Sequence, residues 1–282
     1  MKLSDPGAEI WVPDGLPVEQ ALARTTHMAI AAHPDDAEIM ALDGILAGFG
    51  SQERWFTAVI VTNGAGSPRD GLYTAYTDEQ MQAVRRLEQK KAAMVGEYAA
   101  AVLLNHASSA VKDAGNQGPI EDLRSVIAAA GPELIYTHNL ADKHDTHVAV
   151  ALRTIAALRA LPESARPRRL YGCEVWRDLD WMSDEDKIVF RLDAHDNIGV
   201  ALVSVFDSQI AGGKRYDWAT TGRRRANATY YESHAVDVAQ LMSFAMDLTP
   251  LIQDPELDPA RYVQGFIQRF ASEVNERLKR LS

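Results

Sequence analysis

The feature that most constrains the fold is a regular alternation of short apolar runs with helical segments between residues 27 and 160. The apolar runs, which predict buried strands, are His27–Ala32, Phe56–Thr62, Ala100–Leu104 and Glu133–Thr137. The segments between them, which have helical spacing and helix-start residues, are 36–49, 77–97, 119–130 and 146–160. This alternation predicts an α/β fold with a mostly parallel sheet and helices on both faces.

The pattern is less regular outside this stretch. Residues 1–26 contain several prolines and glycines and read as an N-terminal extension with a weak helix at 17–23. After Pro162 the sequence predicts strands at 168–176 and 188–192, and helices at 197–209, 232–247 and 259–279. Because no linker interrupts the chain, we expect a single domain over residues 27–282, with C-terminal elaborations.

Composition excludes several classes of protein. The net charge of −10 disfavours a nucleic-acid binder, which needs clustered Lys and Arg; the run Arg223-Arg224-Arg225 is interpreted as a solvated face. No apolar run is long enough to span a membrane, and the first residues do not resemble a signal peptide, so a cytoplasmic location is expected. With Cys173 as its single cysteine, the chain can hold a metal only through His and carboxylates.

Histidines and aspartates follow two of the predicted strands. The segment His33-Pro34-Asp35-Asp36 comes directly after the first strand. Because ligands bind beyond the carboxyl ends of parallel strands, this position favours a metal site, with His33 and Asp36 as candidate ligands. Asp35 leaves the turn at another angle, where a general base for a metal-bound water would stand.

The second group is a cluster of three histidines, His138, His144 and His147, after the strand that ends at Thr137. A mixed site of His and Asp with an open position is typical of hydrolytic zinc. One of the three would bind the metal. Another would donate a proton to the leaving group or hold the developing oxyanion.

These motifs resemble those of the PIG-L/LmbE-like N-deacetylases. The first is the segment Ala32 to Glu38, and the second is Thr137-His138-Asn139 followed by Asp142, His144 and His147. Weaker matches are Thr62-x-Gly64, the helix with Arg85 and Glu88, and Asp113. The resemblance covers roughly residues 27–235.

The resemblance implies a Rossmann-like fold and an enzyme that removes an acetyl group from an N-acetylated amino sugar or a related small molecule. It implies that His33, Asp36 and His147 bind one divalent ion. This ion would be Zn²⁺, and Fe²⁺ or another divalent ion is the alternative. Asp35 would be the general base and cationic His144 the general acid or oxyanion donor. The resemblance also implies supporting roles. Asp142 would be a partner of His144, and His138 would be a structural residue. Substrate contacts would come from Arg85, Asp113 and the 63–71 loop.

The chain departs from the family pattern at three places, one of which is the 1–26 extension, because short family members have no counterpart of it. Thr146 stands where a carboxylate often precedes the last ligand, and Phe206-Asp207-Ser208-Gln209 stands where the family often has His-x-Ser-Gln. These changes leave the metal ligands in place but make the substrate uncertain. Aromatic residues of the C-terminal half, among them Trp176, Tyr216 and Trp218, would stack on a sugar ring, or would pack a lid or a subunit interface.

Three alternatives remain open. One is a metal-dependent amidase acting on a non-acetyl amide, such as a thiol-sugar conjugate, and another is a non-catalytic relic of the family. A dinucleotide-dependent oxidoreductase is disfavoured, because the acidic first turn would repel pyrophosphate. We expect a small-molecule partner, no nucleic acid and no membrane; a homo-oligomer stays open.

Overall fold

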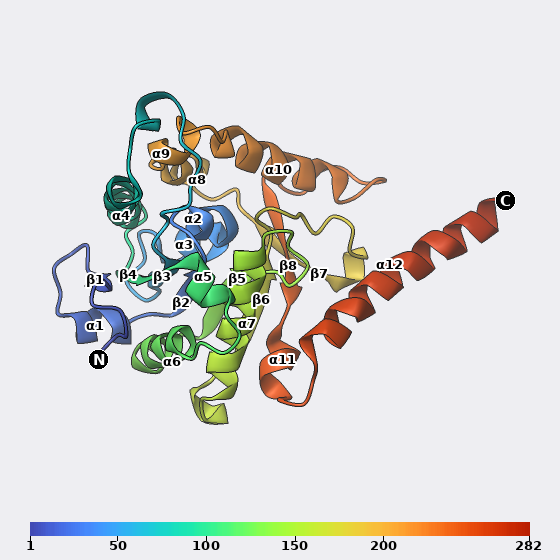
Figure 1. The fold of residues 1–282 in the computed structure, drawn as a ribbon. Helices are drawn as coiled ribbons and strands as arrows, with labels where there is room; N and C mark the ends of the chain where they lie inside the picture. Colours follow the sequence, from blue (N-terminus) through green and yellow to red (C-terminus); the bar gives the residue numbers. More distant parts are fainter.

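A mixed sheet of eight strands forms the centre of the computed structural model, which describes residues 1–282 (Figure 1). The strands are β1 (Glu9–Trp11), β2 (His27–Ala31), β3 (Phe56–Thr62), β4 (Ala100–His106), β5 (Leu134–His138), β6 (Arg169–Cys173), β7 (Lys187–Arg191) and β8 (Met242–Asp247). Their order across the sheet is β1-β4-β3-β2-β5-β6-β8-β7. The five central strands from β4 to β6 run parallel, whereas β1 and β8 pair antiparallel with their neighbours. The predicted class, an α/β fold with a mostly parallel sheet, is confirmed.

Helices cover both faces of this sheet (Figure 1). One group contains α1 (Val18–Ala23), α5 (Ser108–Lys112), α6 (Gly118–Ala130), α7 (Asp145–Arg159) and α11 (Thr249–Gln253). The other contains α2 (Asp36–Met40), α3 (Leu42–Gly48), α4 (Asp78–Val95), α8 (Asp196–Ser204), α9 (Asp207–Ile210) and α10 (Tyr216–Tyr230). The last helix, α12 (Pro259–Leu281), projects from the body of the protein. No helix is both long and apolar enough to cross a bilayer.

The central strands are apolar on both sides because both faces of the sheet are covered. In β2, Met28 and Ile30 join a core cluster that also contains residues of α6 and α7. The alternate residues Ala29 and Ala31 join a second cluster with residues of α2 and α3. A strand that is buried on two faces needs a continuous apolar run, which is why the sequence predicted these strands well.

The N-terminal segment is integrated into this fold. Strand β1 pairs with β4 over Glu9–Trp11 and becomes the edge of the sheet. Leu22 of α1 is buried in the core, 2% exposed. Residues 1–26 therefore extend the sheet and cover one of its faces.

Several predicted elements need correction. The helix predicted over 36–49 is divided at Ala41 into α2 and α3, and the helix over 197–209 is divided before α9. The prediction of a helix over 232–247 is wrong, because residues 242–247 form strand β8 between β6 and β7. Its Met-rich sequence suits a helix, but pairing on both sides overrides this propensity. Helix α10 was not predicted.

Candidate metal centre and active site

The candidate site lies where the neighbouring parallel strands β2 and β5 end. His33 follows β2, and Asp36 begins α2 after a tight turn. The backbone N–H of His33 donates to Oδ2 of Asp36 at 2.8 Å and closes this turn. Asp35 at its apex has a φ of 97°, a conformation that costs about 1–3 kcal/mol and recurs at functional sites. Aspartate is among the non-glycine residues most often found at positive φ.

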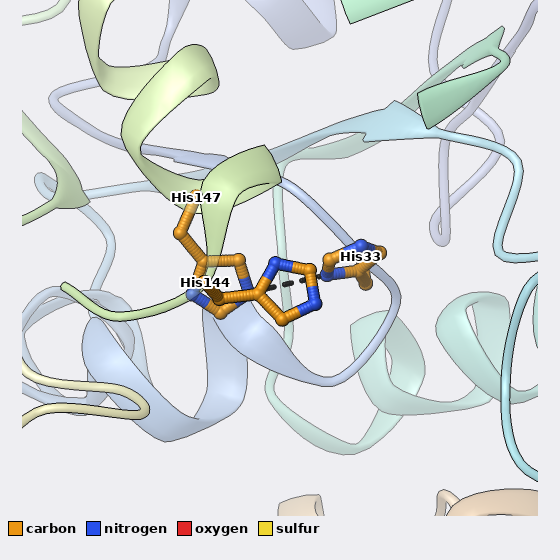
Figure 2. A group of neighbouring side chains, drawn as sticks. All are labelled: His33, His144 and His147. Atoms are coloured by element: carbon orange, nitrogen blue, oxygen red, sulfur yellow. Dashed lines mark hydrogen bonds between the residues drawn. The ribbon is translucent and has the colours of Figure 1, made fainter. Parts of the chain in front are cut away.

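Three potential ligand atoms converge beside this turn. Nδ1 of His33 lies 3.0 Å from Oδ2 of Asp36, and Nε2 of His147 lies 3.2 Å from that same oxygen. The two imidazole nitrogens are 3.2 Å apart, along the dashed line in Figure 2. Zinc bonds of about 2.0–2.1 Å place tetrahedral ligand atoms about 3.3 Å apart, so this triangle has the dimensions of one face of a zinc site.

The charge at this position also suits a cation. Burial opposes the charged form of His147, but the carboxylate of Asp36 and the hydrogen bond with Asp142 raise the pKa of His147 to about 9. Burial likewise opposes ionisation of Asp36, yet His147 and His33 hold its pKa well below the usual value. The positive charge of protonated His147 thus compensates the negative charges of Asp36 and Asp142. A divalent ion at the same place would compensate them as well. The residues present therefore fit a divalent metal.

Asp142 supports His147 rather than the ring of His144. Its Oδ2 lies 3.3 Å from Nδ1 of His147 and accepts a hydrogen bond from the backbone N–H of Trp176 at 3.1 Å. Its Oδ1 accepts from the backbone N–H of His144 at 3.1 Å. A carboxylate on the far nitrogen of a ligand histidine orients the ring and fixes its tautomer. Asp142 is buried and does not line the cavity; it contacts His144 through the backbone N–H of that residue and His147 through the ring.

His138 is buried behind the three converging atoms. Its Nε2 accepts a hydrogen bond from the backbone N–H of Ala32 at 2.9 Å, so this lone pair is already used. Its ring stacks on that of His147 with 3.9 Å between the centroids. Burial, followed by the charge of His147, lowers the pKa of His138 well below its usual value. This geometry agrees with a structural role for His138.

His144 faces the opposite side of the histidine cluster, where Figure 2 shows its ring beside those of His33 and His147. Its ring centroid lies 4.5 Å from that of His147 and 5.1 Å from that of His33. Burial and these two neighbours lower the pKa of His144 to about 4. The prediction of a cationic His144 is therefore corrected: near neutral pH the ring carries one N–H and no charge.

Asp35 is held against the guanidinium of Arg85. Nη2 of Arg85 lies 3.5 Å from Oδ1 of Asp35 and donates to the carbonyl of Pro34 at 2.6 Å, while Nη1 donates to the carbonyl of Gly64 at 3.2 Å. Burial raises the pKa of Asp35 well above its usual value, although Arg85 opposes this shift. Arg85 is 3% exposed and supports the turn and the 63–71 loop, and it also lines the cavity beside Asp35, so its predicted contact with substrate stays a prediction.

A cavity of about 430 Å³ opens in front of these groups. The predicted 63–71 loop contributes Gly64, Gly66 and Ser67 to its lining. Asp113 does not line the cavity; it is exposed at the end of α5 and accepts from the N–H of Gly115 at 3.0 Å. The prediction that Asp113 contacts substrate is therefore not supported by its position.

The C-terminal half supplies a wall that sequence reasoning largely missed. Trp176, Gln209, Lys214 and Tyr216 line the cavity. Trp176 and Tyr216 were among the aromatic candidates, whereas Lys214 was not predicted. Of the departures from the family pattern, Thr146 lines the cavity from α7 in the first half, whereas in the second half Gln209 lines the cavity and Phe206 is buried in the core. The aromatic and cationic residues between Trp176 and Tyr216 were the sequence signal for this wall. No spacing rule, however, predicts that these residues lie close to the first motif.

Comparisons with known proteins agree with this architecture. No curated protein matches the chain in sequence. Among solved structures, the conserved protein TT1542 from Thermus thermophilus has 16% identity and a TM-score of 0.59, covering 83% of this chain and 99% of its own. N,N'-diacetylchitobiose deacetylase from Pyrococcus horikoshii has 13% identity and a TM-score of 0.60, covering 82% and 86%. GalB, the 4-carboxy-2-hydroxymuconate hydratase from Pseudomonas putida KT2440, has 15% identity and a TM-score of 0.57, covering 79% and 96%.

Similarity at this level of identity establishes the fold. A second comparison concerns the sequence: the family model described as PIG-L, GlcNAc-PI de-N-acetylase, matches residues 28–158. That range begins in β2 and ends in α7, so it contains both motifs of the candidate site. Residues 28–158, a little under half of the chain, thus match the PIG-L family model and confirm the resemblance of both motifs to this family.

Proposed function

We propose that this protein is a metal-dependent hydrolase that removes the acetyl group from an N-acetylated amino sugar or a related small molecule. The observation that carries the proposal is the convergence of His33 Nδ1, Asp36 Oδ2 and His147 Nε2 within 3.2 Å of one another beside a cavity. Both halves of the chain line that cavity, which supports residues 27–282 as a single functional domain.

The proposed ligands are His33, Asp36 and His147, and Zn²⁺ is the proposed ion. Imidazole and carboxylate ligands suit zinc and also Fe²⁺, so the donor set supports a small group of divalent metals. When bound, the ion would lower the pKa of a water and polarise the amide carbonyl. The carboxylate of Asp142 would keep His147 oriented for binding.

Asp35 is the proposed general base. It lines the cavity next to Asp36 but makes no ligand contact of its own. Burial raises the pKa of Asp35 toward the range in which a carboxylate accepts a proton effectively near neutral pH. Arg85 would keep the carboxylate in place, since it contacts both Asp35 and the turn that carries it.

His144 is proposed to stabilise the oxyanion and to assist departure of the amine. Its ring also lines the cavity, and its Nδ1 has no partner within the protein. Because the pKa of about 4 keeps the ring neutral, His144 would act through an N–H hydrogen bond instead of a full charge. After Asp35 accepts the water proton, Asp35 rather than the neutral His144 would donate a proton to the leaving nitrogen.

The fold alone does not choose between reactions, because one structural neighbour is named a hydratase and another a deacetylase. The match to a family described as a de-N-acetylase favours amide hydrolysis. The non-acetyl amidase remains the second candidate, since the same groups would act on any accessible amide.

The test is a panel of N-acetylated amino sugars and their conjugates, assayed for acetate and for the primary amine with metal-loaded protein. We expect both products in equal amounts from at least one substrate, and neither from the Asp35→Asn variant. Release of an amine with a different acid would instead support the amidase. Absence of any amide cleavage in a broad panel, with the metal bound, would contradict the proposal.

A further inference from the structure

A second cavity lies behind the catalytic one. Its volume is about 210 Å³, and it is formed by α10 and by the segment that follows β6. Trp176, Lys214 and Tyr216 line both cavities. A molecule whose amide faces the three proposed ligands would therefore extend past these residues into the second cavity.

The second cavity contains more positive than negative charge. Arg223, Arg224 and Lys214 line it, and none of the three forms an ion pair with a carboxylate in the structure. Arg215 also lines it but is paired with Asp217. The Arg223 to Arg225 run was predicted to be a solvated face, and this is wrong for Arg224, which is 5% exposed.

The single acidic residue in the lining is already engaged. Oε2 of Glu174 accepts from the amide of Asn227 at 2.9 Å and from the backbone N–H of Phe244 at 2.9 Å. Oε1 of Glu174 accepts from the backbone N–H of Leu179 at 2.7 Å. Glu174 thus holds the surrounding backbone together and does not neutralise the arginines by direct contact.

Arg224 is a buried cation with an unused donor. Its Nη2 donates to the carbonyls of Glu38 and Ile39 at 2.9 and 3.0 Å, whereas its Nε has no partner. Burial lowers the pKa of Arg224 to about 10, and Glu174 offsets this only in part. A buried charge without a counter-ion is unfavourable, so an anion at this site would be stabilised.

Most of the remaining lining is apolar, with Thr220 and Ser243 as the polar exceptions. Ile39, Val175 and Ala219 contribute to it, together with the ring of Trp176. The cavity thus combines a hydrophobic wall with unpaired cations. A small inorganic ion would leave the apolar surface uncovered, whereas an acidic group on a hydrocarbon or aromatic segment would satisfy both.

We propose that the second cavity is a specificity subsite for a carboxylate or phosphate attached to an apolar segment of the substrate. This inference rests on the proposed function, since it names the class of N-acyl substrate that the site would select. The preferred substrate is then an acidic amide instead of a neutral amino sugar.

Binding of simple probes tests the subsite without catalysis. Isothermal titration of the metal-loaded protein would compare 4-methylbenzoate with the neutral 4-methylbenzamide, and phenyl phosphate would distinguish phosphate from carboxylate. We expect the acid to bind at least about tenfold more tightly than the amide. The Arg223→Met variant should lose this preference, and Arg223→Lys should retain most of it.

Three further variants separate this site from its surroundings. Arg225→Met removes an exposed cation of the same helix outside the cavity and should leave the preference unchanged. Ala219→Trp should fill the cavity and weaken both probes without changing any charge. His33→Ala disrupts the proposed metal site and should not affect the preference.

Equal binding of acid and amide by the unmodified protein would overturn the inference. An equal loss of the preference for the acid in Arg225→Met and Arg223→Met would also overturn it. A loss of this preference in His33→Ala would overturn it too, because the anion would then bind at the metal. Intact acid binding without any amide hydrolysis would contradict the proposed function alone, so the two failures are distinguishable.

Discussion

The two halves of the molecule contribute different parts of the candidate site. Residues 27–160 provide every group proposed to touch the metal or the reacting atoms, and these groups lie in the segments that follow β2 and β5, including the first turns of α2 and α7. Residues 161–282 provide the far wall of the cavity, including Trp176, Lys214 and Tyr216. The chemistry and the choice of substrate are thus assigned to separate regions, and changes in each half should affect different measurements.

The largest effect is expected from Asp35→Asn, in the first half. Turnover should fall by about 10²–10⁴-fold, because general-base assistance is lost. Asparagine tolerates positive φ as aspartate does, so the turn should persist. Steady-state rates and metal content would be measured together. Unchanged turnover at full metal occupancy would remove Asp35 from the proposed mechanism.

Asp142→Asn should act on the metal. Without the carboxylate behind His147, metal affinity should fall by about 10–100-fold, while turnover of the fully loaded variant should change less. Competition with a chelator of known affinity would measure this. The exposed Asp113, which lies outside the cavity, provides a matched control as Asp113→Asn. Equal affinities in both variants would contradict the role of Asp142.

Trp176→Leu, in the second half, should alter substrate binding and leave the metal in place. The aromatic ring lies 6.0 Å from that of His144 and borders both cavities. Loss of its contact with substrate should raise KM by about three- to tenfold. Trp218→Leu, an exposed tryptophan on α10, is the matched control. A loss of metal in Trp176→Leu would break the proposed division between the halves.

The smallest effect on turnover is expected from Glu38→Gln, which tests the packing beneath the site. Burial raises the pKa of Glu38 from 4.5 to about 7, although Tyr98 and Gln89 donate hydrogen bonds to it. An acid whose folded-state pKa is raised destabilises the fold progressively as pH rises from the unfolded value through the folded one.

The wild type should therefore lose stability between about pH 4.5 and 7 relative to Glu38→Gln, by about 1–3 kcal/mol in total. Denaturant unfolding across this range, with a chelator present in all samples, would measure the difference. A constant difference between the two proteins at all pH values would show that Glu38 does not titrate in this range.

The first half was largely predictable because its signals are local. Strand β3 was predicted with its observed bounds, and the segment from His33 to Asp36 is a compact motif fixed by its own turn. The rule that ligands gather at the carboxyl ends of parallel strands predicted that His33 meets one of the three histidines, and the resemblance to the family implied His147.

The second half was less predictable because its structure depends on distant pairing. Strand β8 is buried between β6 and β7, and the predicted helix there reflected only local propensity. The burial of Arg224 is also set by distant partners, since it contacts the carbonyls of Glu38 and Ile39. Likewise, Asp142 was assigned to the nearby His144, whereas the turn before α7 brings its carboxylate to the ring of His147 as well as to the backbone N–H of His144.

The central claim is that His33, Asp36 and His147 bind a single divalent ion. The most direct test is the metal stoichiometry of the purified protein after reconstitution and removal of free ion, measured by mass spectrometry for the wild type and His147→Ala. We predict close to one ion per chain in the wild type and almost none in the variant. A wild type that binds no divalent metal, or a variant that retains full occupancy, would contradict the account.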